Sequence, residues 1–145
     1  MKFEFSAGGI VFQRTKNKEQ RTNLQILVSQ HSQHHGWVFP KGLIGDHIKG
    51  EGKEETALRE VQEETGVLGK ILKPLTPVTY WYVFEKEKIK KTVYYYLMEY
   101  VSGDIKNHDW EMESVEWLPP DKVEERLTYD SDKKVWKEAR KKIPI

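Results

Sequence analysis

The stretch that decides the fold is residues 51–67, Glu-Gly-Lys-Glu-Glu-Thr-Ala-Leu-Arg-Glu-Val-Gln-Glu-Glu-Thr-Gly-Val. It predicts a helix from Lys53 to Glu64 that stops at Gly66, because glycine readily takes the conformation that ends a helix. At about 100° per residue, the apolar side chains of this helix fall on one side and form a stripe that we expect to be buried. The stripe consists of Ala57, Leu58 and Val61.

Three carboxylates lie beside this stripe, on Glu60, Glu63 and Glu64. Like charges at this spacing repel, at roughly 0.2–0.5 kcal/mol per pair in an isolated helix. They also lie near the negative end of the helix dipole, so a compensating cation is expected. Hard oxygen ligands suit Mg²⁺ or Mn²⁺ together with substrate phosphates, and Arg59 can orient one carboxylate through a bidentate bond. The alternative for such acids is a solvated, charged helix face.

The whole string resembles the Nudix box, since every fixed position of that family motif is filled at the family's spacing. The matching residues are Gly45, Glu51, Arg59-Glu60-Val61, Glu63-Glu64 and Gly66-Val67. The segment Pro40-Lys41-Gly42 also resembles the family's lead-in, but Glu51 follows Gly42 by nine positions rather than six. Either Gly42 or Gly45 could therefore serve as the box glycine, and the lead-in favours Gly42. We expect the longer loop, with Asp46 and His47, to trim or gate a phosphate site.

Other segments look like the diadenosine tetraphosphate hydrolase branch of the same family. They are Phe5–Val11, Tyr80–Tyr82, Lys91–Leu97 and Trp110–Leu118. The resemblance implies an α+β fold of the Nudix type, an α/β/α sandwich with a mixed β-sheet and a catalytic loop–helix–loop. It also implies hydrolysis of a nucleoside diphosphate linked to a further group.

The resemblance assigns roles to the acidic helix. Glu60 and Glu64 would be the main metal ligands, with Glu63 contributing directly or through water. Arg59 would hold the helix carboxylates in place, and Glu51 would anchor the loop to the helix.

A later acid, Glu111, matches a position that in this branch binds metal or serves as general base. Asp109 and Glu113 are close enough in sequence to be confused with it. A mobile acid on a surface loop is an equally good interpretation of Glu111.

Five further residues are candidates for binding substrate. Lys41 and Lys91 could contact phosphates as point charges, although a solvated lysine is the usual alternative. Tyr80, Tyr82 and Tyr94 could stack on a nucleotide base, a contact worth about 1–3 kcal/mol per base. Since alternate residues of a strand face opposite sides, we expect one or two of these tyrosines to contact ligand and the others to pack.

The remaining sequence predicts strands mixed with helices, which favours an α+β architecture. The first strand is expected to be interrupted at Ala7-Gly8-Gly9, and Lys41–Gly52 is expected to be a loop. The last helix is expected to be capped by Ser131 or Asp130. The expected strands are Phe3–Phe12, Leu24–Ser29, the hairpin of Pro77–Phe84 and Ile89–Val101, and Val115–Leu118; the other helices are Asp121–Leu127 and Asp132–Lys142.

The composition fits one soluble domain over residues 1–145, with 37% hydrophobic and 32% charged residues. The formal net charge of +1 and the absence of cysteine argue against a stable nucleic-acid partner, disulfides and thiolate metal sites. The first residues lack the apolar core of a signal peptide, so a cytoplasmic location without a membrane partner is expected.

Together these features predict a Mg²⁺-dependent pyrophosphohydrolase, with Mn²⁺ as a possible substitute, that acts on a small nucleotide. Dinucleoside polyphosphates such as diadenosine tetraphosphate are the expected substrates. The alternatives are the same chemistry on nucleoside triphosphates or on 5′-triphosphorylated RNA ends, and a non-catalytic nucleotide-binding module. The intact box acids count against the last of these.

Overall fold

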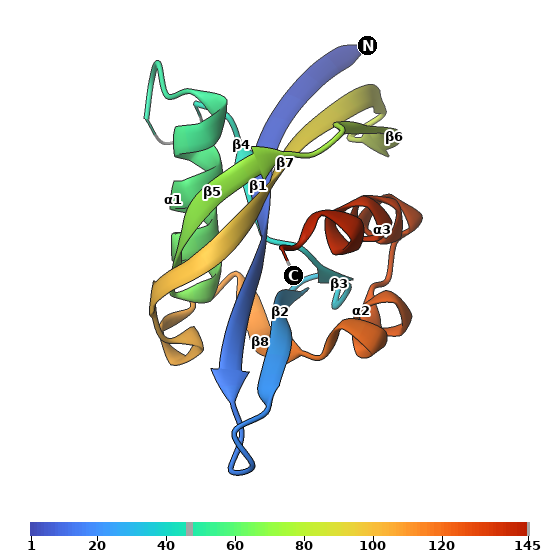
Figure 1. Cartoon of the computed structure of the whole chain (residues 1–145). Coiled ribbons are helices and arrows are strands. Elements are labelled where there is room, and N and C mark those ends of the chain that lie inside the picture. Colours follow the sequence, from blue (N-terminus) through green and yellow to red (C-terminus); the bar gives the residue numbers. More distant parts are fainter. Residues whose placement is uncertain (46–47, 145) are drawn as a thin grey trace.

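A computed structural model describes residues 1–45 and 48–144 of the chain. The expected gating role of Asp46 and His47 lies outside the described residues. The described residues form an eight-stranded mixed sheet with helices on both faces (Figure 1). Its strands are β1 (Lys2–Lys16), β2 (Thr22–His31), β3 (Trp37–Val38), β4 (Lys41–Leu43), β5 (Val67–Pro74), β6 (Val78–Phe84), β7 (Glu87–Gly103) and β8 (Met112–Leu118); its helices are α1 (Lys53–Thr65), α2 (Pro120–Arg126), α3 (Asp130–Lys142) and the 3₁₀ turn η1 (Ile105–Asn107).

Strand β1 organises the sheet, because it pairs parallel with β7 along residues 2–12 and antiparallel with two further strands. Its first half pairs with β4 and its second half with β2. The expected interruption at Ala7-Gly8-Gly9 is wrong, since β1 is continuous through these residues. The glycines are needed for close packing: a Cβ on Gly8 would overlap the carbonyl oxygen of Pro40.

The two faces of the sheet carry separate apolar cores. Helix α1 covers one face, where Ala57 and Val61 pack with Val11 and Met98. Helices α2 and α3 cover the other face, as Figure 1 shows, and Trp136 of α3 is fully buried there. The α/β/α sandwich predicted from the sequence is therefore confirmed.

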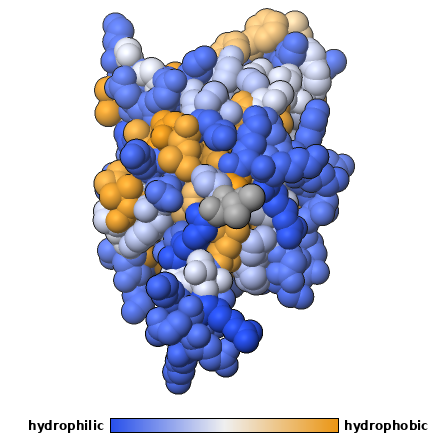
Figure 2. Space-filling view, viewed as in Figure 1, coloured by the Kyte–Doolittle hydropathy of each residue, from blue (hydrophilic) through white to orange (hydrophobic). Residues whose placement is uncertain are grey.

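Hydrophilic side chains cover the turn between β1 and β2, which projects from the body of the molecule (Figure 2). In residues 1–45 and 48–144, no helix combines the length and the apolar composition that crossing a membrane requires.

Three local expectations differ from the structure. Lys41–Leu43 form β4 rather than a loop, because these residues find hydrogen-bonding partners in Ser6–Gly8. Val67–Pro74 form an additional strand, β5, which pairs with β7 through two register shifts. Helix α3 begins at Asp130 with Tyr129 as its N-cap, so neither Asp130 nor Ser131 caps it with a side chain.

Helix α1 closely matches its predicted bounds and extends to Thr65. Gly66 takes the left-handed conformation with φ of 81° and ends the helix, as the sequence predicted.

Replacing Gly8 with alanine tests the close packing of β1 against the segment before β4. The Gly8→Ala variant should lose about 1–3 kcal/mol of unfolding free energy, the usual cost of inserting a methyl group into a packed site. Urea denaturation followed by circular dichroism measures this loss. The matched control is Gly52→Ser, because Gly52 is the N-cap of α1 and serine is a favourable N-cap residue. Equal stability of the two variants would contradict the packing argument.

Candidate active site

Helix α1 presents its carboxylates in two environments. Glu60 and Glu64 point under the helix and are 6% and 4% exposed, whereas Glu63 is exposed. The spacing of four residues places Glu60 and Glu64 one turn apart on the face that meets the sheet. Glu60 and Glu64 are therefore buried together. The sequence pattern had placed them beside the apolar stripe and had not indicated their burial.

Arg59 joins the acids of this helix and its preceding loop. Its Nε and Nη2 donate to the two carboxylate oxygens of Glu51 at 2.8 and 2.9 Å. Its Nη1 donates to Glu60 at 2.8 Å and to Glu63 at 3.0 Å. Thr56 adds a hydroxyl donor to Glu51 at 2.7 Å. The hydrogen bond to Glu51 is the largest cause of a raised pKa for Arg59, so this guanidinium stays charged.

Gly42 brings β4 against the buried acids. A Cβ at this position would overlap the carboxylate of Glu60, so residue 42 has no room for a side chain. A Cβ on Gly45 would meet nothing closer than 4.0 Å, although its φ of 75° also favours glycine. Gly42, which the lead-in favoured as the box glycine, is therefore the one in contact with the acidic helix.

The carboxyl of Glu64 has a strongly raised pKa. Burial raises its pKa well above the ordinary value, and the nearby acids Glu60, Glu111 and Asp109 raise it further, while Lys41 opposes them. The backbone N–H of Lys41 donates to its Oε2 at 3.0 Å. A second cation beside Glu64 would offset this concentration of negative charge.

The donor chemistry of this group suits a hard divalent cation, because all of its side-chain donors are carboxylate oxygens. Glu111, in the loop before β8, is near enough to Glu64 to raise its pKa. Among the described residues, however, no three acidic or histidine side chains converge closely enough to enclose an ion. The Glu63 carboxylate instead contacts Arg59.

A cavity of about 760 Å³ opens on the other side of β4, between the β6–β7 hairpin and the start of α3. Four of the five predicted substrate residues line it, namely Lys41, Tyr80, Tyr82 and Lys91. The structure does not bring Tyr94 to this cavity. Tyr94 lies on the opposite face of β7, with the ammonium of Lys53 4.5 Å from its ring centroid.

The cavity also contains residues that the sequence analysis did not single out: Gln33, His34, Val38, Tyr95, Tyr129, Asp130, Ser131 and Asp132. Their convergence depends on how α3 packs against the sheet, and no local motif signals it. Asp132 is the most buried acid of the set, with 3% exposure.

Glu4 is a further acid beside the cavity that the sequence analysis missed. The hydroxyl of Tyr82 donates to Glu4, and the ammonium of Lys91 lies 3.9 Å from it. Burial and the nearby charge of Lys41 lower the pKa of Lys91, while Glu4 opposes them. The sequence signal that could have found it is the alternation of Glu4 with Phe3 and Phe5, which are exposed, because alternate residues of a strand face opposite sides of the sheet.

Buried acids on a helix after a glycine-rich lead-in, beside a basic and aromatic cavity, define a Nudix-type site. The chain belongs to the Nudix family, since the family model described as NUDIX domain matches residues 5–139.

Curated relatives include two different kinds of protein. The chain is 39% identical over 100 residues to a putative mutator protein MutT4 of Mycobacterium tuberculosis, covering 68% of this chain and 39% of that protein. It is 34% identical over 121 residues to the asymmetrical bis(5′-nucleosyl)-tetraphosphatase of Rattus norvegicus, covering 81% and 80%. The chain thus spans well under half the length of the first of these relatives.

The fold is shared with a solved Ap4A hydrolase binary complex from C. elegans. The TM-score is 0.68 at 22% identity, and the likeness covers 95% of this chain and 96% of that one. The similarity to the tetraphosphatase branch expected from the sequence is confirmed.

The raised pKa of Glu64 predicts a pH-dependent effect of Glu64→Gln in metal-free protein. A carboxyl whose pKa is higher in the folded state stabilises the fold below its ordinary pKa, and that stabilisation is lost as pH rises through the folded value. Glu64→Gln should therefore be more stable than the wild type at pH 8, by about 1–3 kcal/mol, the usual cost of an incompletely compensated buried polar group. At pH 4 the difference should shrink. Urea denaturation in EDTA at both pH values measures it, and an unchanged difference would contradict the electrostatic cause.

Proposed function

We propose that this chain is a Mg²⁺-dependent pyrophosphohydrolase that cleaves dinucleoside polyphosphates such as diadenosine tetraphosphate, with Mn²⁺ able to replace Mg²⁺. The observation that carries the proposal is the position of Lys41. Its side chain lines the cavity while its backbone N–H contacts the buried carboxylate of Glu64. A phosphate chain entering from the cavity would therefore reach the acidic helix at this residue.

The cavity has the chemistry of a nucleotide site. Lys41 and Lys91 supply positive charge for phosphate oxygens, and the rings of Tyr80 and Tyr82 offer faces for a base. Burial alone would lower the pKa of Lys41, but Tyr80, Asp132 and Glu64 outweigh it and raise that pKa. Lys41 therefore remains a cation at neutral pH.

The carboxylates supply the catalytic half of the proposed site. Glu60 and Glu64 would hold the divalent cation, with Glu63 contributing directly or through water. That cation would neutralise phosphate oxygens, polarise phosphorus and activate the attacking water. Arg59 and Glu51 keep the helix carboxylates oriented, and Glu111 serves as a further ligand or as general base.

The named relatives support a nucleotide substrate and leave its length open. The tetraphosphatase relative aligns over most of both chains, which favours a dinucleoside polyphosphate. Nucleoside triphosphates and 5′-triphosphorylated RNA ends would use the same chemistry. The proposed location of the protein is cytoplasmic.

Hydrolysis in ¹⁸O-labelled water tests the reaction. With Mg²⁺ and diadenosine tetraphosphate, the wild type should release two nucleotides, one carrying the label at the attacked phosphorus. Glu64→Gln should reduce kcat by about 100-fold or more, as expected when a metal-ligating carboxylate is lost. Glu55→Gln is the matched control, because Glu55 is an exposed acid of the same helix.

Mass spectrometry of the products reads out the label. A higher kcat/KM for a nucleoside triphosphate than for diadenosine tetraphosphate would reject the proposed substrate. Absence of turnover of diadenosine tetraphosphate, nucleoside triphosphates and 5′-triphosphorylated RNA, with nucleotide still bound, would reject the enzyme in favour of a binding module.

Neighbouring lysines on β7 test the cavity as the phosphate site. Lys91 lines the cavity, whereas Lys90 faces the other side of the strand, 5.6 Å from the ring centroid of Trp81. Lys91→Met should raise KM by about tenfold, equivalent to the loss of one charge-assisted contact of roughly 1.4 kcal/mol. Lys90→Met should leave KM unchanged. Steady-state kinetics measures both, and equal effects would place the phosphates elsewhere.

A further inference from the structure

The segment Phe39-Pro40-Lys41 is tied at each of its three residues to a different element. The Phe39 N–H donates to Oδ1 of Asp132 in α3 at 3.2 Å. The Pro40 carbonyl accepts from the N–H of Gly9 in β1 at 3.2 Å. The Lys41 N–H donates to Glu64 of α1 at 3.0 Å. The segment therefore runs from one helix layer, across the sheet, to the other layer.

Asp132 makes the connection on the cavity side. It lies in the first turn of α3, is 3% exposed, and also accepts from the hydroxyl of Tyr95 at 3.4 Å. Burying a carboxylate costs free energy unless hydrogen bonds compensate for the lost water. Within residues 1–45 and 48–144 no cation lies within ion-pairing distance of Asp132, and the charge of Lys41 acts on it from further away. The hydrogen bonds from Phe39 and Tyr95 are therefore its direct contacts.

We propose that Asp132 is a positioning residue that fixes the Phe39–Lys41 segment, so that Lys41 presents its backbone to Glu64 and its side chain to the cavity. Asp132 does this through the Phe39 N–H, two residues before Lys41. Its effect on catalysis rests on the proposed function. Its effect on the segment does not, because the three hydrogen bonds are made between residues of the chain itself.

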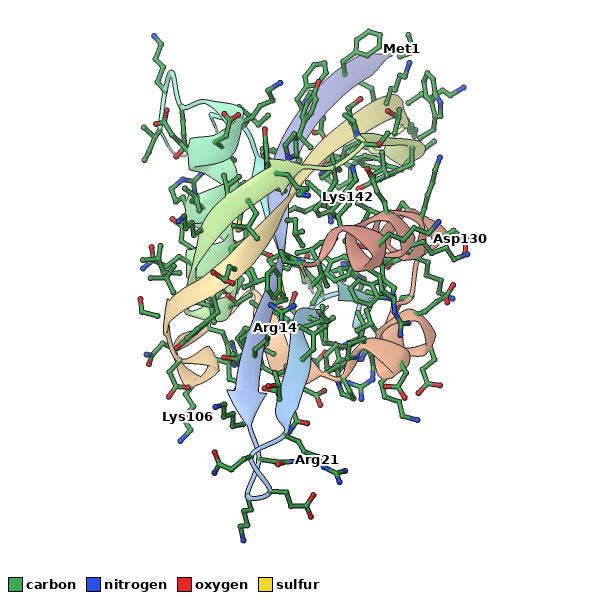
Figure 3. All side chains as sticks on the ribbon, in the orientation of Figure 1. Met1, Arg14, Arg21, Lys106, Asp130 and Lys142 are labelled. Atoms are coloured by element: carbon green, nitrogen blue, oxygen red, sulfur yellow. The ribbon has the colours of Figure 1, made fainter. Side chains whose placement is uncertain are left out.

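The proposal separates Asp132 from the other acid at the start of the same helix. Asp130 also borders the cavity but is exposed, and Figure 3 shows it at the outer edge of α3. Asp130 belongs to the first helical residues, so both acids benefit from the same helix dipole. Of the two, the structure gives Asp132 the hydrogen bond to Phe39. Asp130→Ala is therefore the matched control for loss of an acid at this end of α3.

Two variants of Asp132 distinguish hydrogen bonding from charge. Asp132→Ala removes the acceptor, and Asp132→Asn keeps an acceptor oxygen of the same reach while removing the charge. Amide hydrogen exchange by NMR, on the whole chain without substrate, reports the segment directly. In Asp132→Ala the amides of Phe39 and Lys41 should exchange about tenfold faster or more, as expected for a local loss of stability. Asp132→Asn and Asp130→Ala should keep the protection of the wild type.

Kinetics on the substrate that the wild type turns over gives the second readout. Asp132→Ala should lower kcat by about 10- to 100-fold, the scale of a small displacement at a reacting centre, with a much smaller change in KM. Asp132→Asn should restore kcat to near the wild-type value. If Asp132→Ala does not fold, Asp132→Ser, which is also too short to reach Phe39 as aspartate does, takes its place in both measurements.

Three outcomes would overturn the proposal. One is a Lys41 amide whose protection is the same in Asp132→Ala as in Asp130→Ala. Another is an Asp132→Ala variant that raises KM without lowering kcat, because that pattern belongs to a residue that only binds substrate. The third is an Asn variant as impaired as the Ala variant. Failure of the proposed function would appear differently, as absence of turnover by the wild type with the exchange pattern intact.

Discussion

The candidate site depends on the guanidinium of Arg59, which lies among several carboxylates. Arg59 contacts Glu51, Glu60 and Glu63 at once, so its guanidinium offsets the negative charge that these carboxylates bring together at the loop and helix. A guanidinium suits this place because its five donors form a planar fork that a lysine ammonium cannot reproduce. Glu64 lies one turn beyond Glu60, and burial together with the nearby acids raises its pKa well above the ordinary value.

The second constraint is close backbone approach. Gly8 admits the Pro40 carbonyl, and Gly42 admits the Glu60 carboxylate. These contacts allow the short strand β4 to lie between β1 and α1, with the cavity on one side and the acids on the other. The proposed substrate contacts and the proposed catalytic carboxylates thereby lie next to each other, although they come from opposite layers of the sandwich.

Local chemistry carried the sequence prediction a long way. The spacing of Glu60 and Glu64, the stop at Gly66 and the lead-in ending at Gly42 were readable because each depends on residues within one turn or one loop. Long-range register was not readable. Glu4 meets Lys91 because β1 pairs with β7 in one alignment, and Asp132 reaches Phe39 across 93 positions of sequence. Alternation showed that Tyr94 and Tyr95 face opposite sides of their strand, but only the packed helices determine which side has the cavity.

The pairing of β1 with β7 limits where residues can be inserted into such a chain. Paired to β7 along residues 2–12, this strand sends Glu4 toward the cavity and leaves Phe3 and Phe5 on the outer face. One residue inserted near the beginning of β1 would exchange these two faces. A phenylalanine side chain would then lie where Glu4 now contacts Lys91 and Tyr82. The connection between β4 and α1, where Glu51 follows Gly42 by nine positions rather than six, lies outside the strands, so a change of its length need not shift a strand pairing. Insertions and deletions in this architecture are therefore accommodated in the connections, whereas the strands must keep their length and register.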